Sequence, residues 1–401
     1  MSNHNNYNKT LYACFTGYIV QAIVNNFVPL LFLTFQKSYG IPLSKITLLV
    51  TINFALQLII DLVSISFIDR LGYRVSAVVA HIFAAIGFIS LTILPELTPD
   101  PFAGIMISVI IYAVSGGLLE VLVSPIVEAC PTDNKEKAMS LLHSFYCWGH
   151  VAVVLLSTIF FYLAGIHNWK ILAVLWAIIP IINSVTFAKV PIAPLIDEEE
   201  TELTIGELCH SKIFWVLMLF MVCAGASEQG VSQWASTFAE KGLSVSKTIG
   251  DLAGPMFFAV MMGSSRAIYG KFGDRINLYK FMNLSCVLCI MAYLLTSLSP
   301  YPVLSLLGCG LCGLSVGIMW PGSFSIASAS IPRGGTALFA LLALAGDLGC
   351  SGGPTVVGFA ASAFGDNLRN GILVGTIFPI LLLAGLFLKR TLDAKNPQKS
   401  L

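Results

Sequence analysis

Long apolar segments recur along the whole chain, and they constrain its fold more than any other feature. The hydrocarbon core of a bilayer is about 30 Å thick, so a helix that crosses it needs about 20 mostly apolar residues. Inside that core no water satisfies the backbone, so apolar segments of this length form helices. Twelve segments qualify, at about 10–35, 44–67, 75–95, 102–129, 137–163, 170–189, 213–239, 248–270, 278–298, 302–329, 335–364 and 371–389. The sequence therefore predicts an all-α membrane protein with twelve transmembrane helices.

The composition agrees with a chain that lies in lipid. Of its 401 residues 56% are hydrophobic and only 11% are charged, whereas a soluble domain carries roughly 25% charged residues. Too little polar surface is present to cover a soluble fold of this size. The net charge is +1, which gives no indication of a nucleic-acid partner. We therefore expect the lipid bilayer as a partner and no nucleic acid.

The ten cysteines do not predict a metal or redox site. Two pairs, Cys286/Cys289 and Cys309/Cys312, have C-x-x-C spacing, but they lie in predicted spans without His or carboxylate neighbours. A buried cysteine behaves as a small apolar side chain. We interpret both pairs as packing residues and expect no metal and no cofactor.

A short repeat divides the chain into two related halves. The second span is followed by the segment IDRLGYR at 68–74, and the eighth by GKFGDRI at 270–276. The two Asp-Arg pairs are 205 residues apart, about half the chain. Six spans precede the acidic stretch 197–200 and six follow it. This predicts two pseudo-symmetric six-helix bundles, at 1–190 and 212–401, joined by a cytoplasmic linker at 191–211.

The distribution of positive charges predicts the orientation of these spans. With both termini in the cytoplasm, fifteen Lys and Arg residues lie on the inner side and six on the outer side. Such an excess is typical of cytoplasmic loops. We therefore predict a multi-pass protein of the cell membrane, most simply a bacterial inner membrane, with both termini cytoplasmic.

The two Asp-Arg loops resemble the signature loop of the major facilitator superfamily. The first copy has Ile65 where that family usually has glycine, and the second keeps the glycine as Gly270. The resemblance extends over nearly the whole chain through span number and symmetry. It implies the major facilitator fold, with a solute site near the middle of the membrane between the halves.

Patterns within the spans resemble a narrower group, the fucose permease-like sugar/proton symporters. Segment 117–125 is similar to their fourth helix and segment 313–321 to their tenth. Glu228 and Trp234 resemble their seventh. However, Ser124 replaces the usual asparagine, and Pro29 stands where the fucose carriers have an aspartate. The resemblance thus indicates the subfamily without its substrate.

Polar side chains within the spans are the candidates for solute binding, because an ionisable or amide group is costly in lipid unless it has a use or a partner. Amides both donate and accept hydrogen bonds, and aromatic rings stack on the C–H face of a pyranose, so together they suit an uncharged polyol. Hydrogen bonds between helices are the alternative explanation. The predicted solute-binding residues are Gln21, Asn25, Asn53, Glu120, Tyr146, His150, Glu228, Gln229, Gln233, Trp234, Trp320 and Asp347.

Glu120 and Glu228 are the predicted proton-coupling residues. A carboxyl group in the middle of a span can bind a proton from one side and release it to the other as the cavity changes its face. A carboxyl group that stays protonated and only forms hydrogen bonds is the alternative for Glu120. Glu228 could also accept a hydrogen bond from a sugar hydroxyl.

A third set of residues is predicted to form gates or to hold the loops. Asp61 and Arg266 each precede their Asp-Arg pair by eight residues and carry opposite charges. They could form a salt bridge on the cytoplasmic side, or each could pair with a helix end. The predicted gating and structural residues are Asp61, Asp69, Arg70, Arg266, Asp274 and Arg275.

Together, residues and resemblance predict a secondary active transporter. It would carry a small polar solute, a sugar or related polyol, by proton-coupled alternating access, as a monomer. The alternatives are a multidrug/proton antiporter or another organic-solute exporter, and a sensor that binds without transport. An ATP-driven pump and an intramembrane enzyme are not expected, since the sequence has no G-x-x-x-x-G-K-S/T and no H-x-x-x-H element.

Overall fold

The computed structural model describes residues 7–131, 135–193, 203–272, 276–331 and 334–395, which form helices without any strand. Contacts between Cα atoms divide the chain into two units, Met1–Asp197 and Glu198–Leu401. The linker at 191–211 stays a prediction, because most of its central part, 194–202, lies outside the described residues.

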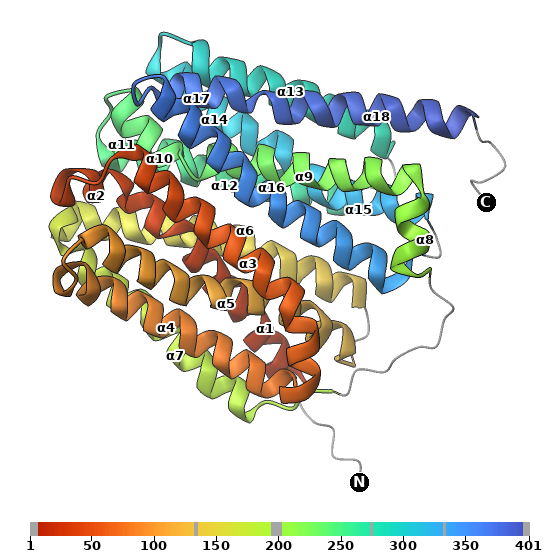
Figure 1. Cartoon of the computed structure of the whole chain (residues 1–401), viewed down its shortest axis with the longest axis horizontal. Helices are drawn as coiled ribbons and strands as arrows, with labels where there is room; N and C mark the ends of the chain where they lie inside the picture. The colour runs from red at the N-terminus through yellow and green to blue at the C-terminus, as the bar shows by residue number, and fades with distance from the viewer. Residues whose placement is uncertain (1–6, 132–134, 194–202, 273–275, 332–333, 396–401) are drawn as a thin grey trace. The chain divides into compact units, whose positions relative to one another are not determined.

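The N-terminal unit consists of long helices with one early interruption (Figure 1). Pro29 has no N–H to donate, and a 3₁₀ turn replaces the α-helix there. The first predicted span is therefore α1, η1 and α2 in succession. The elements are α1 (Asn8–Asn26), η1 (Val28–Leu31), α2 (Phe32–Tyr39), α3 (Leu43–Leu71), α4 (Tyr73–Leu97), α5 (Pro101–Ala129), α6 (Lys135–Ala164), η2 (Ile166–Asn168) and α7 (Trp169–Lys189).

The C-terminal unit has more interrupted helices. The seventh and eighth predicted spans each contain a π-helical turn, and the tenth is broken after Val316. Such turns leave backbone groups outside the regular α-helical pattern, and they are frequent at functional sites. The elements are α8 (Ile205–His210), α9 (Lys212–Ser232), α10 (Ala235–Thr237), η3 (Phe238–Gly242), α11 (Lys247–Asp251), η4 (Leu252–Met256), α12 (Phe257–Phe272), α13 (Leu278–Leu298), α14 (Pro302–Val316), α15 (Met319–Ser330), α16 (Gly335–Ala363), α17 (Leu368–Gly375) and α18 (Ile377–Lys395).

Helices occupy all twelve predicted spans. Within the described residues, ten segments are long and apolar enough to cross a membrane by length and composition. The two predicted spans that are not among these ten are 248–270, which is interrupted as α11, η4 and α12, and 335–364, which is the continuous helix α16. The all-helical membrane fold is thus confirmed.

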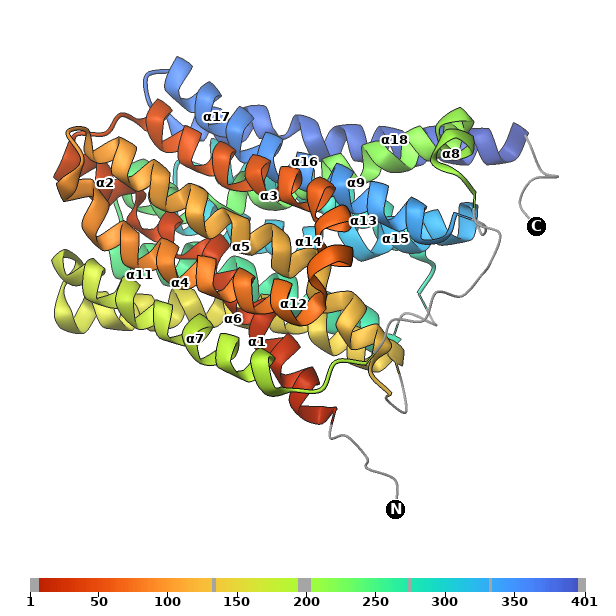
Figure 2. The same ribbon diagram turned by 60° about the horizontal axis from the view of Figure 1, so that its bottom comes forward.

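In the N-terminal unit α5 is the central helix. It packs against α1, α3 and α4, and α4 packs in turn against α7, as both ribbon views show (Figure 2). Glycines permit this close packing: a Cβ added at Gly87 would lie 2.5 Å from Tyr112 Cβ. Two of the neighbours of α5, namely α1 and α3, carry predicted site residues.

His81 fastens three helices of this unit. Its Nδ1 lies 2.7 Å from the Ala77 carbonyl, and Asn183 donates to its Nε2 over 2.8 Å. The same Asn183 amide donates to the Ala13 carbonyl over 3.0 Å. A buried polar group needs such partners. His81 therefore joins α4 to α7 and, through Asn183, to α1, and it is a hydrogen-bonded packing residue.

The first Asp-Arg loop is held by a glycine and an arginine. Gly72 has φ of +80°, a conformation that favours glycine, and it separates α3 from α4. Arg74 donates to the carbonyl oxygens of Phe187 and Ala188 over 3.2 and 2.9 Å. Arginine thereby satisfies acceptors at the C-terminal end of α7, which a helix leaves unpaired.

In the C-terminal unit α9 packs closely against α16, and α13 against α14 and α18. Gly349 and Gly353 of α16 make the close contact with α9 possible. A Cβ at Gly349 would overlap the Val222 carbonyl, and one at Gly353 would overlap the Ala226 carbonyl. The two backbones therefore meet without intervening side chains, as small-residue spacing permits in membranes.

Candidate solute-binding site

A first polar cluster joins α1 to α5 in the N-terminal unit. The Gln21 amide donates to Glu120 Oε2 over 2.6 Å. Gln21 is buried and Glu120 is half-buried. One turn before Gln21, Tyr18 lies 3.1 Å from the Ser124 hydroxyl, which is one turn after Glu120. Spacings of three and four residues place these side chains on facing sides of the two helices.

Asn25 extends the cluster to α3. Its Oδ1 accepts from Asn53 Nδ2 over 3.2 Å and from Gln57 Nε2 over 2.8 Å. All three amides are buried. Gly116 of α5 makes room for them, since a Cβ there would lie 2.5 Å from Gln57 Cδ. The five side chains Gln21, Asn25, Asn53, Gln57 and Glu120 are referred to below as the N-terminal polar cluster.

One acceptor of this cluster has no hydrogen-bond partner among the described residues. Asn53 Oδ1 is buried and receives no hydrogen bond from the described residues. An unsatisfied buried acceptor costs about 1–3 kcal/mol. A group that donates a hydrogen bond at this position would remove that cost.

The predicted residues of α6 lie at different depths. His150 is buried, whereas Tyr146 is half-buried. The neighbouring Gly149 packs against α1, where a Cβ would lie 2.9 Å from Ala22 Cβ. Closer to the start of α6, the exposed His143 ring lies 5.4 Å from the Tyr18 ring. Hence α6 lies beside the same helix that carries Gln21 and Asn25.

A second polar cluster lies in the C-terminal unit. Arg266 Nη2 of α12 is 3.4 Å from Glu228 Oε2 of α9. On α9 itself, the Gln229 amide donates to Glu228 Oε1 over 3.2 Å, and the Gln233 amide donates to Gln229 Oε1 over 2.9 Å. These four residues form the C-terminal polar cluster. In it Gln233 donates to Gln229, and Gln229 donates in turn to the Glu228 carboxylate.

Arg266 also reaches a helix break. Its Nε donates to the Gly317 carbonyl over 3.3 Å, at the interruption between α14 and α15. A Cβ at Gly317 would lie 2.7 Å from Ser265 Cβ, so glycine permits α12 to approach this break. The ion pair and the interruption of the tenth predicted span are thus connected through one guanidinium.

The two predicted tryptophans differ in position. Trp234 is fully buried, and its indole N–H donates to the Pro354 carbonyl over 3.0 Å. Trp320 is half-buried, and its ring covers Gly346, where a Cβ would overlap it. Asp347, the next residue of α16, is buried. Of the two tryptophans, Trp320 is the one that keeps exposed surface, which stacking on a solute requires.

The predicted gating residues are described only in part. Asp61 and Arg266 are half-buried, and their mutual contact stays a prediction. The side chains of Asp69 and Arg70, at the end of α3, and the residues Asp274 and Arg275 lie outside the described part of the chain.

Two residues in or beside the N-terminal polar cluster were not predicted as site residues. Gln57 and Tyr18 are not among the predicted site residues, although helical spacing could have indicated both. Tyr18 lies three residues before Gln21, and Gln57 lies four residues after Asn53. Residues at these spacings share a helix face.

The two polar clusters suit hydrogen bonding to a small solute more than metal binding. In the part of the chain that the structure describes, no group of three or more His, Cys, Asp or Glu side chains could hold a metal ion. The amides offer both donors and acceptors, and the carboxyl groups of Glu120 and Glu228 can exchange protons. Such groups can bind an uncharged polar molecule and couple its binding to protonation.

Comparison with solved structures shows the fold. A bacterial homologue of the human lysosomal transporter Spinster, in an inward-facing occupied conformation, has a TM-score of 0.77 at 13% identity, covering 98% of this chain and 99% of that chain. A mutant of the nucleoside transporter NupG has a TM-score of 0.75 at 13% identity, with 95% and 99% covered. A mutant of the fucose:proton symporter FucP of E. coli has a TM-score of 0.66 at 13% identity, with 95% and 98% covered.

Comparison with protein families gives a more specific result. No curated protein sequence matches the chain significantly. A family model described as Major Facilitator Superfamily matches residues 13–354, which is most of the chain. Together with the polar clusters inside its spans, this match shows that the chain is a multi-pass membrane transporter that belongs to the major facilitator superfamily.

Proposed function

We propose that the protein is a secondary active transporter that carries a sugar or related polyol together with protons. The observation that supports this most directly is the unpartnered Asn53 Oδ1 in the N-terminal polar cluster, which receives no hydrogen bond from the described residues. It lies beside Asn25 and Gln57, whose amides add further donors and acceptors. A solute hydroxyl donates one hydrogen bond and accepts others, so it complements these amides without bringing a charge into the span.

Glu120 is the proposed proton-coupling group of this cluster. The Gln21 amide donates a hydrogen bond to the Glu120 carboxyl group. Protonation would leave one carboxyl oxygen as a donor and change which partners suit it. The affinity for a solute that binds next to Glu120 would therefore depend on whether this side chain is protonated.

Glu228 is the proposed second coupling group. Its negative charge is balanced by Arg266, which also donates to the Gly317 carbonyl. Protonation would remove the charge that holds the guanidinium. Arg266 could then move relative to the break between α14 and α15, which links proton binding to a change in helix shape.

Uptake into proteoliposomes tests this function. A panel of labelled monosaccharides, polyols and nucleosides is offered with and without an inward proton gradient. We expect at least one hydroxylated solute to accumulate only with the gradient. If none accumulates and lipophilic cations are expelled instead, the protein is a multidrug/proton antiporter. If a solute binds but does not move under any gradient, the protein is a sensor.

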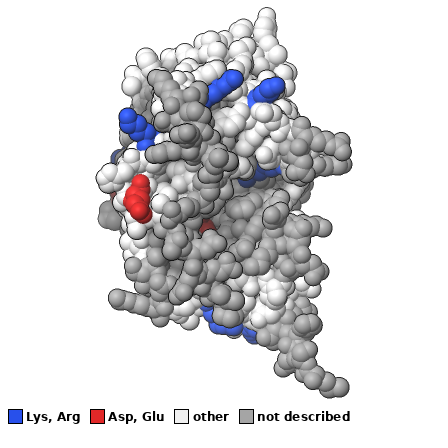
Figure 3. All heavy atoms as spheres, turned by 90° about the vertical axis from the view of Figure 1, so that its right-hand side faces the viewer, with Lys and Arg blue, Asp and Glu red and all other residues white. Residues whose placement is uncertain are grey.

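We propose further that the protein is a monomer in the cell membrane, with both termini in the cytoplasm, as in a bacterial inner membrane. The excess of Lys and Arg in the predicted inner loops supports this orientation. Figure 3 looks onto the end where α8 and the C-terminal end of α18 lie. Among its described residues, Lys and Arg are spread over the surface, while Asp and Glu cover little of it.

A native cysteine tests the orientation. Cys209 of α8 is exposed and the other nine cysteines are buried. A membrane-impermeant maleimide should label Cys209 in inside-out vesicles and leave it unlabelled in right-side-out vesicles. The reverse result would place α8 on the outer side.

A further inference from the structure

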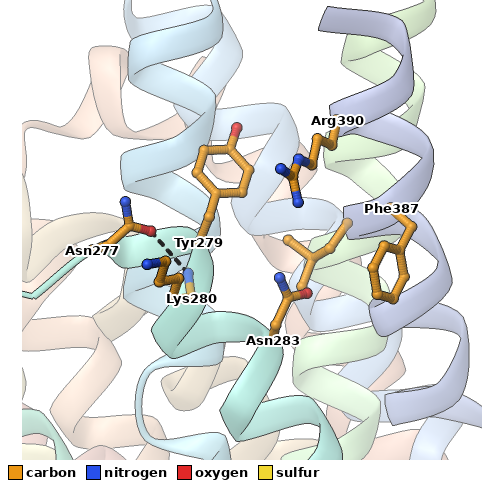
Figure 4. Close-up of a pocket in the computed structure, with 7 residues that line it drawn as sticks. Asn277, Tyr279, Lys280, Asn283, Phe387 and Arg390 are labelled. Carbon is orange, nitrogen blue, oxygen red and sulfur yellow. Dashed lines mark hydrogen bonds between the residues drawn. The ribbon is translucent and has the colours of Figure 1, made fainter. Parts of the chain in front are cut away.

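A separate cavity of about 270 Å³ lies between the start of α13 and the end of α18. It belongs to the C-terminal unit and shares no residue with either polar cluster. Its lining consists of two cationic side chains, two amides, one phenol and two apolar side chains. The lining residues are Asn277, Tyr279, Lys280, Asn283, Leu386, Phe387 and Arg390 (Figure 4).

The charge of this cavity is positive. Lys280 and Arg390 line it from two different helices, and no Asp or Glu is among the lining residues. Within the described residues, neither cation forms an ion pair. A third cation, Lys389, lies with its Nζ 5.4 Å from the centre of the Tyr279 ring, which holds that ring against α18. The cavity is therefore suited to a negatively charged group.

A hydrogen-bond acceptor in the cavity sets a second requirement, namely that the ligand also carries a hydrogen-bond donor. Asn283 Oδ1 is buried and accepts no hydrogen bond from the described residues. Figure 4 shows the Asn283 amide and the Arg390 guanidinium directed into the same space between the helices, whereas Lys280 lies on the Asn277 side of α13. An ionised phosphodiester would satisfy the guanidinium, but its phosphate has no proton to donate to Asn283. A phosphate ester that also carries a hydroxyl group satisfies both.

The apolar side of the cavity indicates where such a ligand comes from. Leu386 and Phe387 form this wall, and the Phe387 side chain is 56% exposed. Both α13 and α18 belong to segments that can span a membrane, and the cavity lies at their ends. A site that is cationic at the membrane surface and apolar towards the core matches a phospholipid, whose headgroup and acyl chains have the same order.

We propose that this cavity binds the headgroup of an anionic phospholipid of the phosphoglycerol class. Arg390 holds the phosphate, Lys280 adds positive charge on the Asn277 side of α13, Asn283 Oδ1 accepts from a glycerol hydroxyl, and Phe387 contacts the upper part of an acyl chain. The site is independent of the solute pathway.

Native mass spectrometry of the purified full-length protein tests this site. The protein is mixed in detergent with equal amounts of dioleoyl phosphatidylglycerol and dioleoyl phosphatidylcholine, and the retained lipids are counted. We expect wild type to retain phosphatidylglycerol preferentially. Each cation near the membrane surface contributes about fivefold to the affinity for anionic lipid. Hence Arg390→Gln should reduce retention about fivefold, and Lys280→Gln/Arg390→Gln by more.

Three further variants separate the contributions. Lys212→Gln removes an exposed cation at the start of α9, outside the cavity, and should leave retention unchanged. Arg390→Lys keeps the charge and should retain most of the binding, which distinguishes lost charge from lost folding. Asn283→Leu should reduce the preference for phosphatidylglycerol over phosphatidic acid, which has no glycerol headgroup.

Two results would overturn the proposal. One is equal retention of phosphatidylglycerol by wild type and by the double variant. The other is displacement of the lipid by millimolar inorganic phosphate, which would show a site for a soluble anion and not for a lipid.

Discussion

Arg266 Nη2 lies 3.4 Å from Glu228 Oε2, and this ion pair connects α12 to α9 within the C-terminal unit. The two side chains are 22% and 10% exposed. Removing charges from water is costly, and the mutual attraction compensates only while both partners are present. The stability of the contact between α9 and α12 therefore depends on the charge of Glu228.

Glu228→Gln should destabilise the protein, because it leaves Arg266 without its counter-charge. Arg266→Gln should do the same for the carboxylate. The double variant should be more stable than the sum of both effects predicts, with a coupling energy of about 1–3 kcal/mol. Thermal unfolding of the four proteins in one detergent measures this cycle. Additive effects would show that the pair contributes no net interaction.

Glu120→Gln should abolish accumulation driven by a proton gradient, because the glutamine side chain does not bind and release a proton at the pH of the experiment. Exchange of labelled for unlabelled solute needs no net proton movement, so it should continue. Glu96→Gln is the matched control, since Glu96 lies at the exposed end of α4 and pairs there with Lys170. Gradient-driven accumulation by Glu120→Gln at the wild-type level would exclude Glu120 as the coupling group.

Asn53→Leu should weaken solute binding about five- to tenfold, because it removes the acceptor that a solute hydroxyl would use. Asn25→Leu should have a larger effect on stability, about 1–3 kcal/mol, since the amides of Asn53 and Gln57 both lose their acceptor. Asn26→Leu is the control on the same helix, where the buried amide bonds the Ala22 carbonyl. Initial uptake rates and thermal unfolding of each variant separate the two effects. If Asn26→Leu weakens binding as much as Asn53→Leu, the cluster is not the solute site.

Gly349→Ala should destabilise the C-terminal unit by about 1–3 kcal/mol, because the added methyl group has no room against the Val222 carbonyl. Gly352→Ala lies on the same helix, and its added Cβ meets nothing within 4 Å. It should leave stability unchanged or raise it by about 0.5–1 kcal/mol, because alanine favours the helix. The difference between the two melting temperatures tests the close contact of α9 with α16. Equal melting temperatures would contradict it.

Several features follow from the sequence with little help from the structure. The twelve apolar segments predict the helices because a continuous apolar segment of about 20 residues satisfies its own backbone in lipid as a helix. Positions such as Gly349 and Gly353 indicate a close helix contact through their spacing alone. His81, inside a span, is expected to need hydrogen-bond partners, although nothing in the sequence identifies Asn183 as one of them.

Structural details within the spans could not be predicted from the sequence. The π-helical turns η3 and η4 are not visible in hydropathy, because that measure averages over many residues. Trp234 and Trp320 both lie within predicted spans, but Trp234 bonds Pro354 and is buried, whereas Trp320 covers Gly346 and stays half-buried. Which face of a helix meets which neighbour depends on packing over the whole unit.

The sequence by itself determined that this chain is a helical membrane protein with polar groups at the middle of its spans, since the cost of exposing backbone and charge to lipid acts on every residue locally. Only the tertiary structure decided the partners of those groups. Gln21 meets Glu120 across 99 positions of sequence, and Glu228 meets Arg266 across 38. Such pairings arise because helices far apart in the chain pack side by side, and a hydrogen bond extends over about 3 Å of space whatever the separation along the sequence.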